Sequence, residues 1–223
     1  MWLGIKAAAV CVSLVVLFRI FSSVRDTPTR FVLTAVWLRY VLAAFHDFTY
    51  GPVVAGFSIN ALASIGVVGV GLLLVRKSAL LMQHLWPAYL LVGAILLSGV
   101  INASPIDLVD VLTKWGYFIV IGLCAYDAVR IHGLPQFAKI LAAAFIVPLG
   151  MQYLSFALGA AKALESDGSV SYIGMYNHES IFSITLLTFV FLASLPGAWR
   201  RNMKCGSSSG TGRTPPFRPA ATA

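Results

Sequence analysis

The chain has 223 residues, of which 59% are hydrophobic and only 11% are charged, and its formal net charge is +8. A soluble domain carries roughly a quarter charged residues, so this composition excludes an ordinary soluble globular protein and indicates an integral membrane protein. We attribute the positive charge to cytoplasmic loops rather than to nucleic-acid binding, because Lys and Arg collect on the cytoplasmic side of membrane proteins.

Apolar runs long enough to cross a membrane recur along the chain. A helix needs about 20 apolar residues to cross the hydrocarbon layer, and the continuous character of these runs predicts helices rather than strands. The expected fold is therefore an all-α, polytopic transmembrane helix bundle of about seven spans within residues 1–198. The predicted spans are Leu3–Phe21, Phe31–Phe48, Val53–Val75, Ala79–Ile101, Leu108–Tyr126, Phe137–Ala161 and Glu179–Leu195.

Three of these runs have distinctive features. The first resembles a signal peptide in length, but no small-residue cleavage site precedes Arg19, so we expect a retained helix. The second is the least regular, since it contains Arg39 and ends at His46 and Asp47. In the sixth, Pro148 predicts a kink.

Basic residues fall in alternate connections between the predicted spans. Arg25 and Arg30 follow the first span, whereas residues 49–52 and 102–107 contain no Lys or Arg. The positive-inside rule therefore places the N-terminus outside the cell and the end of the seventh span inside. The other basic residues on the expected cytoplasmic side are Arg19, Arg76, Lys77, Arg130, Lys139, Arg200, Arg201 and Lys204.

The composition changes abruptly near Met203. Residues 199–223 are rich in Gly, Ser, Pro and Thr and have almost no apolar periodicity, so we expect a disordered cytoplasmic tail. The abruptness also suggests that the native reading frame is lost near this point.

No metal or cofactor is expected. His178 and Glu179 begin the zinc-protease pattern H-E-x-x-H, but the position of the second histidine is Phe182. Nucleotide-binding and haem motifs are absent from the sequence. The cysteines have no paired spacing, so neither a disulfide framework nor a zinc site is predicted; they are Cys11, Cys124 and Cys205.

Glycines recur inside the third predicted span. Gly66, Gly69 and Gly71 form the stretch IGVVGVG, which does not match G-x-G-x-x-G and does not follow a predicted strand. Close helix packing explains them better than nucleotide binding.

Arg39 is the residue that costs the most free energy to place in a membrane within the apolar part of the sequence. It lies near the middle of the second predicted span, where an unpaired cation costs a few kcal/mol or more. Lys114 lies inside the fifth, and at ~1.5 Å per residue we expect both cations at similar depths below the outer face. Together they can hold a diphosphate. The alternative is ion pairing: Arg39 with Asp47, and Lys114 with Asp110 at i,i+4, which we prefer for Lys114.

Four polar residues directly precede the last predicted span: Asn177, His178, Glu179 and Ser180. In the expected orientation they lie at its outer mouth, where side chains and backbone amides can cap the helix or meet a polar head group. A satisfied helix entrance and a functional site are both open interpretations.

Three features carry a family resemblance across roughly Trp2–Leu195. The first is the series of hydrophobic spans with short loops. The second is Ser98–Arg130, with its short polar outer turn and aromatic helix. The third is Tyr172–Leu187, YIGMYNHESIFSITLL, a glycine, an aromatic residue and an Asn-His pair entering an apolar helix. In these features the chain resembles the N-terminal half of the bacterial O-antigen ligase and O-antigen/exopolysaccharide polymerase superfamily.

The resemblance implies a metal-independent, GT-C-like glycosyltransferase of the bacterial inner membrane that uses no cofactor. Such an enzyme takes a glycan from an undecaprenyl diphosphate carrier at the periplasmic face and joins it to a growing polymer or a lipid acceptor. Family members have a large periplasmic loop with the Arg and His residues thought to do the chemistry, and that segment has no counterpart in this sequence. The chain would then form part of a carrier-lipid groove and be inactive alone.

Site roles and partners follow from this resemblance. Arg39 and Lys114 would contact the diphosphate, Asn177 would lie on the rim of the groove, and His178 is the candidate catalytic base. The expected partners are membrane lipid, the undecaprenyl diphosphate-linked glycan and other membrane proteins of polysaccharide assembly.

Two further classes are open. A secondary transporter or permease predicts internal repeats and broken helices at mid-membrane. Comparison of Leu3–Ile101 with Leu108–Leu195 shows no convincing repeat, and Pro148 with Gly150 gives one broken-helix signal. A non-enzymatic membrane assembly protein predicts instead that Arg39 and His178 tolerate substitution.

Overall fold

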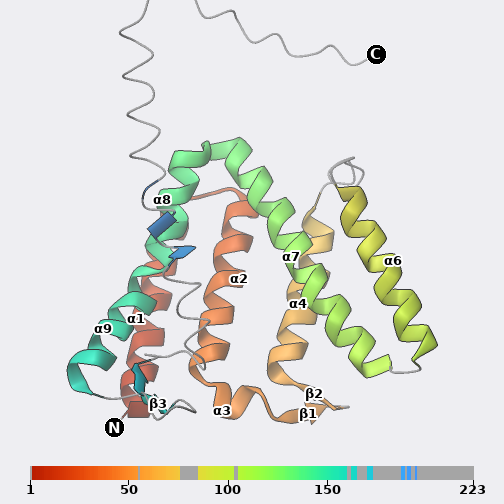
Figure 1. Ribbon diagram of the computed structural model, residues 1–223. Helices are drawn as coiled ribbons and strands as arrows, with labels where there is room; N and C mark the ends of the chain where they lie inside the picture. Colours follow the sequence, from red (N-terminus) through yellow and green to blue (C-terminus); the bar gives the residue numbers. More distant parts are fainter. Residues whose placement is uncertain are drawn as a thin grey trace, which may run out of the picture.

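The computed structural model describes residues 2–54, 56–75, 85–102, 105–159, 162–164 and 170–172, with the isolated positions 187, 188, 190, 191 and 194. These residues form a helical bundle (Figure 1). Its main helices are α1 (Trp2–Ser23), α2 (Thr27–Ala44), α4 (Ile59–Leu74), α6 (Trp86–Ile101), α7 (Pro105–His132), α8 (Leu134–Ala144) and α9 (Ile146–Leu158).

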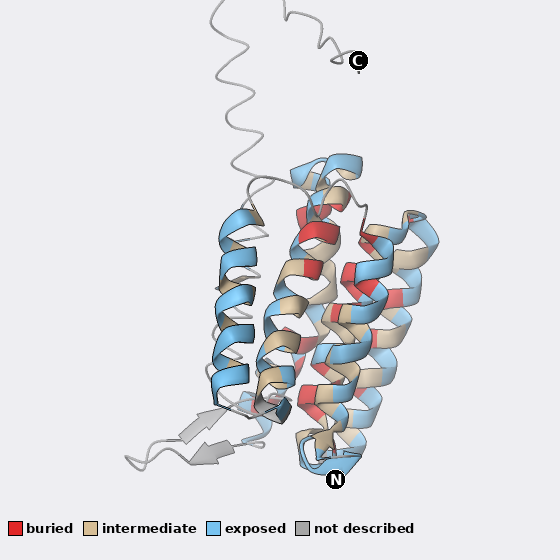
Figure 2. Cartoon of the chain, turned by 90° about the vertical axis from the view of Figure 1, so that its right-hand side faces the viewer, coloured by how far each residue is buried: buried red, intermediate tan, exposed pale blue. Residues whose placement is uncertain are grey.

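The helices run alternately up and down in Figure 1, and α7 is the central element. It packs against α2, α4 and α6, while α1 packs against α2 and α9. With 28 residues, α7 is about 42 Å long at ~1.5 Å per residue, enough to cross a bilayer with its head-group regions. Figure 2 shows that burial is concentrated in the inner helices, and α6 has no buried residue.

Basic side chains join α1 and α2 at both ends. At the upper end in Figure 1, Arg30 donates from Nε to the carbonyl of Val24 at 2.7 Å and from Nη2 to that of Phe21 at 2.9 Å. At the lower end, Nζ of Lys6 donates to the carbonyl of Ala44 at 2.9 Å. Both cations thus satisfy carbonyls that a helix end leaves without an intrahelical partner.

A short hairpin precedes α4. The single-turn helix α3 (His46–Thr49) leads into strands β1 (Pro52–Val54) and β2 (Phe57–Ser58), which pair antiparallel. The hairpin turns at Gly56, whose φ of 82° suits glycine. Our prediction that the third span begins at Val53 is therefore wrong by six residues. The helix begins at Ile59, after Ser58, whose hydroxyl accepts a hydrogen bond from the amide of Ala61.

The sixth predicted span consists of two helices. α8 and α9 meet at Phe145 with a bend of 40°. Pro148 has no N–H to donate to the carbonyl of Ala144, four residues earlier, and its ring crowds that carbonyl. The predicted kink is therefore confirmed. A second hairpin, β3 (Lys162–Leu164) with β4 (Val170–Tyr172), follows α9.

One of the three glycines in α4 explains its close contact with α7. A Cβ on Gly71 would overlap Cγ1 of Val120 and lie 2.8 Å from Cζ of Phe31. Gly66 and Gly69 have no atom within 4 Å of such a Cβ. The predicted packing role of the glycines therefore belongs to Gly71.

The apolar surface of the bundle suits lipid. Two described helices are long and apolar enough to cross a membrane, Leu3–Ser23 and Leu108–His132, and the bent pair α8–α9 is a third candidate. α4 and α6 are apolar but shorter, with 16 residues each. Large apolar side chains such as Phe18, Phe118 and Val100 are exposed, as expected of a lipid-facing surface. The described residues therefore form an α-helical membrane bundle with two or three candidate spans.

The described residues do not contain all of the seven spans that we expected. α2 is less apolar because it carries Arg30 and Arg39. The seventh predicted span, Glu179–Leu195, lies almost wholly outside the described residues, and so does the tail, 199–223.

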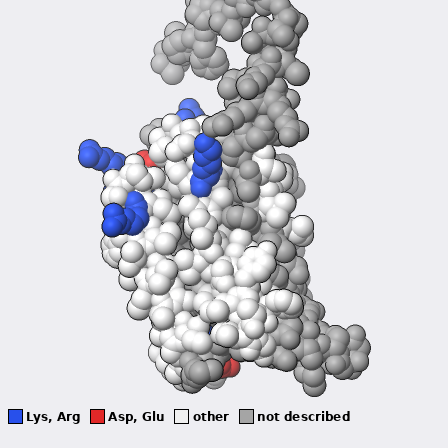
Figure 3. Space-filling view, turned by 90° about the vertical axis from the view of Figure 1, so that its left-hand side faces the viewer, with Lys and Arg blue, Asp and Glu red and all other residues white. Residues whose placement is uncertain are grey.

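Charge is distributed unevenly along the bundle axis. On the face shown in Figure 3, the visible Lys and Arg side chains gather mainly at the upper end, where α1 and α7 end and α2 begins. Asp47 and the hairpin β1–β2 lie at the opposite end. We call these the basic end and the hairpin end.

Candidate functional site

Arg39 joins α2 to α4 near the hairpin end. It lies five residues before the last residue of α2, and its Nη1 donates a hydrogen bond of 2.7 Å to Oδ1 of Asn60, the second residue of α4. The ion pair with Asp47 that we considered is not formed. Asp47 instead lies beside His46, with 2.9 Å between Oδ1 and Nε2.

Tyr117 of α7 packs against the same part of α2. Its hydroxyl donates to the carbonyl of Ala35 at 3.1 Å. Arg39, Ser64 and Tyr117 also line a small cavity between α2, α4 and α7. Its volume is only about 10 Å³, at the lower limit for one water molecule. A ligand can therefore reach the exposed guanidinium of Arg39 from the surface but cannot enter between the helices.

The contact between Tyr117 and Ala35 indicates the relative heights of the two predicted cations. α2 and α7 run in opposite directions in Figure 1, so moving four residues from Ala35 to Arg39 corresponds to moving from Tyr117 back toward Lys114. At ~1.5 Å per residue, Arg39 and Lys114 lie within about one helical turn of the same level. This agrees with their expected similar depths, on neighbouring helices.

Lys114 has a carboxylate partner. Its Nζ lies 2.6 Å from Oδ2 of Asp110, so the predicted i,i+4 pair is confirmed. Both side chains are exposed, 68% for Lys114 and 44% for Asp110. Exposed pairs of this kind are worth about 0.3–0.5 kcal/mol on a helix, so a phosphate can compete with Asp110 for the ammonium.

Arg39 differs from Lys114 in its charge balance. Its hydrogen-bond partner, Asn60, is neutral, and none of the carboxylates whose side chains the structure describes forms an ion pair with it. The amide fixes the guanidinium without cancelling its charge. We call Arg39, Asn60, Tyr117 and Lys114 the Arg39 site.

The structure describes two of the four predicted site residues. Arg39 and Lys114 lie at similar heights on α2 and α7, whereas Asn177 and His178 lie outside the described residues. No group of three or more His, Cys, Asp or Glu side chains that could hold a metal occurs in the described ranges.

Asn60 and Tyr117 are not among the site residues predicted from the sequence. Asn60 carried a usable signal, because it is a polar amide at the start of a long apolar run. Tyr117 carried none, since aromatic residues are common in membrane helices for reasons unrelated to a site.

Comparison of the chain with protein-family models, with curated proteins and with solved structures finds no match. The resemblance to the O-antigen ligase and polymerase superfamily therefore stays a prediction that depends on the sequence features alone.

Proposed function

We propose that this protein is a multi-pass protein of the bacterial inner membrane that takes part in cell-surface polysaccharide assembly. In this proposal it binds a glycan carried on undecaprenyl diphosphate at the hairpin end of the bundle. The observation that carries the proposal is the uncancelled charge of Arg39, which a neutral amide holds in place near the end of a membrane-protein helix.

The position of Arg39 supports a binding role. Its guanidinium is exposed near the end of α2 and carries a charge that no described carboxylate cancels, so it is available to an anionic head group. A diphosphate accepts two parallel hydrogen bonds from a guanidinium and supplies the missing negative charge. Lys114, near the same level on α7, can add a second cation by exchanging Asp110 for the phosphate.

The glycosyltransferase step is part of the same proposal. Diphosphate is a good leaving group, so transfer needs cations at the diphosphate and a base for the acceptor hydroxyl, without a metal or cofactor. Arg39 and Lys114 supply the cations, Asn177 lies on the groove rim, and His178 is the candidate base. The sequence pattern is the support for the last two roles.

The proposed topology has seven spans with the hairpin end outside the cell. Its support is the alternation of basic and non-basic connections in the sequence and the alternate directions of the helices in Figure 1. This orientation places the Arg39 site toward the face at which the carrier would present its glycan.

The test is replacement of Arg39 in a strain that makes the polysaccharide. Arg39→Gln keeps a polar side chain that can still contact Asn60 but removes the charge, and we expect loss of polymer or ligated glycan with unchanged membrane insertion. Arg39→Lys keeps the charge and should retain part of the activity. Arg25→Gln, at the basic end, is the matched control for loss of one arginine. If the Arg39→Gln strain makes glycan of normal length and amount, the proposed function is excluded.

A transporter is the second candidate, favoured by the broken helix pair α8–α9. It predicts that Pro148→Ala impairs substrate uptake while surface polysaccharide stays normal. The polysaccharide proposal predicts instead that Arg39→Gln reduces surface polysaccharide more than Pro148→Ala does.

A further inference from the structure

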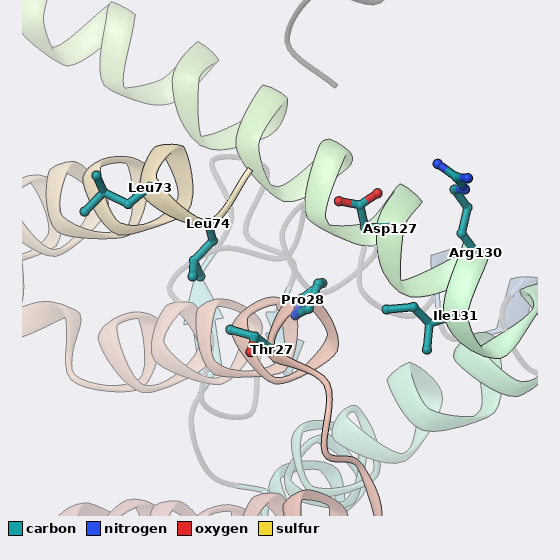
Figure 4. Close-up of a pocket in the computed structure, with 7 residues that line it drawn as sticks. All are labelled: Thr27, Pro28, Leu73, Leu74, Asp127, Arg130 and Ile131. Atoms are coloured by element: carbon teal, nitrogen blue, oxygen red, sulfur yellow. The ribbon is translucent and has the colours of Figure 1, made fainter. Parts of the chain in front are cut away.

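A second cavity lies at the basic end of the bundle, away from the Arg39 site. It has a volume of about 530 Å³ and opens between the start of α2, the end of α4 and the last part of α7 (Figure 4). Its lining residues are Thr27, Pro28, Leu73, Leu74, Asp127, Arg130 and Ile131. We call it the Arg130 cavity.

The walls of the Arg130 cavity are about equally polar and apolar, and their apolar side chains continue onto the outer surface. Leu73 is 86% exposed and Ile131 is 55% exposed. On a membrane protein such side chains face lipid. The cavity is therefore open to the bilayer at the level where apolar surface gives way to the charged end.

Two opposite charges line the same cavity. Asp127 and Arg130 stand three residues apart on α7, which makes them neighbours on the helix surface. Neither forms an ion pair with the other or with another residue of the described ranges. The guanidinium of Arg130 instead stands over the ring of Tyr126, 5.9 Å from its centroid. One cation and one anion are thus both available to a ligand.

At the start of α2, the backbone of Pro28 and Thr29 offers no free N–H to an anion. Pro28 has no N–H, and the amide of Thr29 already donates to Oδ2 of Asp26 at 3.0 Å. Among the lining residues that the structure describes, Arg130 is the one cation and Asp127 the one anion. A purely anionic ligand would meet Asp127 unfavourably, whereas a ligand with a phosphate and an ammonium group satisfies both.

We propose that the Arg130 cavity binds a phosphoethanolamine group, with its phosphate on Arg130 and its primary ammonium on Asp127. The openness of the cavity to the bilayer favours phosphatidylethanolamine as the source, with the glycerol and upper acyl chains lying on Leu73 and Leu74. Free phosphoethanolamine has the same charged groups and is the soluble alternative. This inference does not depend on the polysaccharide assignment.

The test is competition between lipids on the purified full-length protein. Native mass spectrometry of detergent-solubilised protein counts bound lipids after equilibration with equal amounts of phosphatidylethanolamine and phosphatidylglycerol. We expect several-fold preference for phosphatidylethanolamine. Asp127→Asn should abolish the preference by weakening retention of the ammonium lipid, and Arg130→Gln should weaken retention of both lipids. Lys139→Gln, an exposed cation outside the cavity, is the matched control and should behave as the wild type.

Soluble phosphoethanolamine separates the two sources. If it fails to displace the bound lipid at millimolar concentration, the lipid is the ligand; if it displaces the lipid fully, the headgroup recognition holds and the source is soluble. Equal or stronger retention of phosphatidylglycerol by the wild type would overturn the proposal. An unchanged preference in Asp127→Asn would overturn it as well, since that variant alters neither the size of the side chain nor the walls of the cavity.

Discussion

Nε2 of His132 lies 2.6 Å from Oδ1 of Asp26, so the last residue of α7 contacts the residue that caps α2, 106 positions earlier in the chain. The same carboxylate accepts a hydrogen bond from the amide of Thr29. Both side chains are largely buried, with 15% of Asp26 and 21% of His132 exposed. Asp26 therefore caps the start of α2 and also binds the end of α7 to it.

This contact predicts an acid-sensitive contribution to stability. Burial alone would raise the pKa of Asp26, but hydrogen bonds from Thr29 and the neighbouring His132 outweigh it and lower the pKa below the ordinary 3.8. A lowered folded-state pKa means that the contribution is fully present above pH 3.8 and is lost as the pH falls through the lower folded value. Thermal unfolding in detergent, measured from about pH 6 downward, should show this loss.

Two variants at Asp26 separate charge from capping. Asn is as good an N-cap as Asp, so Asp26→Asn should lower stability at neutral pH only modestly. The stability of this variant should depend less on pH in the acidic range than that of the wild type. Asp26→Ala removes the cap too and should cost about 1 kcal/mol more. If the wild type and Asp26→Asn lose stability in parallel as the pH falls, Asp26 is not the group responsible.

Gly71 predicts a packing defect on substitution. Gly71→Ala places a methyl group against Val120 and Phe31, and overpacking of this kind typically costs about 1–3 kcal/mol. Gly69→Ala, two residues away in the same helix with open space around it, should be neutral or slightly stabilising because Ala favours the helix. Unfolding midpoints in detergent compare the two, and equal midpoints would contradict the close contact between α4 and α7.

Pro148 predicts a change of shape rather than a loss of fold. Pro148→Ala restores the N–H that can donate to Ala144, so the helix pair should straighten from its bend of 40°. Spin labels at the exposed positions Leu134 and Leu158 report this as a longer distance in pulsed electron resonance. An unchanged distance would mean that contacts with α1 and α2, rather than the proline, impose the bend.

Loss of the ion pair between Asp110 and Lys114 should have a small effect on stability and a larger effect on lipid binding. Asp110→Asn should change the free energy of unfolding by less than about 0.5 kcal/mol, because the pair is exposed. It should raise the affinity for a diphosphate lipid several-fold, since Lys114 then has no competing carboxylate. Lipid-binding titrations check this, and reduced affinity would exclude Lys114 from the Arg39 site.

How much of this could be predicted from the sequence depends on the kind of signal. The helices of the bundle and the kink near Pro148 follow from hydrophobic run length and from proline chemistry, which act locally. The i,i+4 pair of Asp110 and Lys114 is equally local. The start of α4 was misplaced because Val53 and Val54 are as apolar as a helix interior, and only the turn at Gly56 reveals the hairpin.

Contacts between distant residues were beyond prediction. Nothing in the spacing of Arg39 and Asn60, or of Asp26 and His132, indicates that they meet. Their pairing depends on how the helices pack, which hydrophobic periodicity does not define. A run of apolar residues on all sides of a helix gives little information about which face meets which neighbour.

The central claim is a membrane-embedded bundle with its hairpin end outside the cell and its basic end in the cytoplasm. Single cysteines test it directly, introduced by Gly51→Cys in the hairpin end and Gln136→Cys in the basic end, after replacement of Cys11, Cys124 and Cys205 by Ser. In intact bacterial cells, a membrane-impermeant maleimide should label the first variant at once and the second only after permeabilisation. Labelling of the Gln136→Cys variant in intact cells would contradict the orientation and remove the Arg39 site from the outer face.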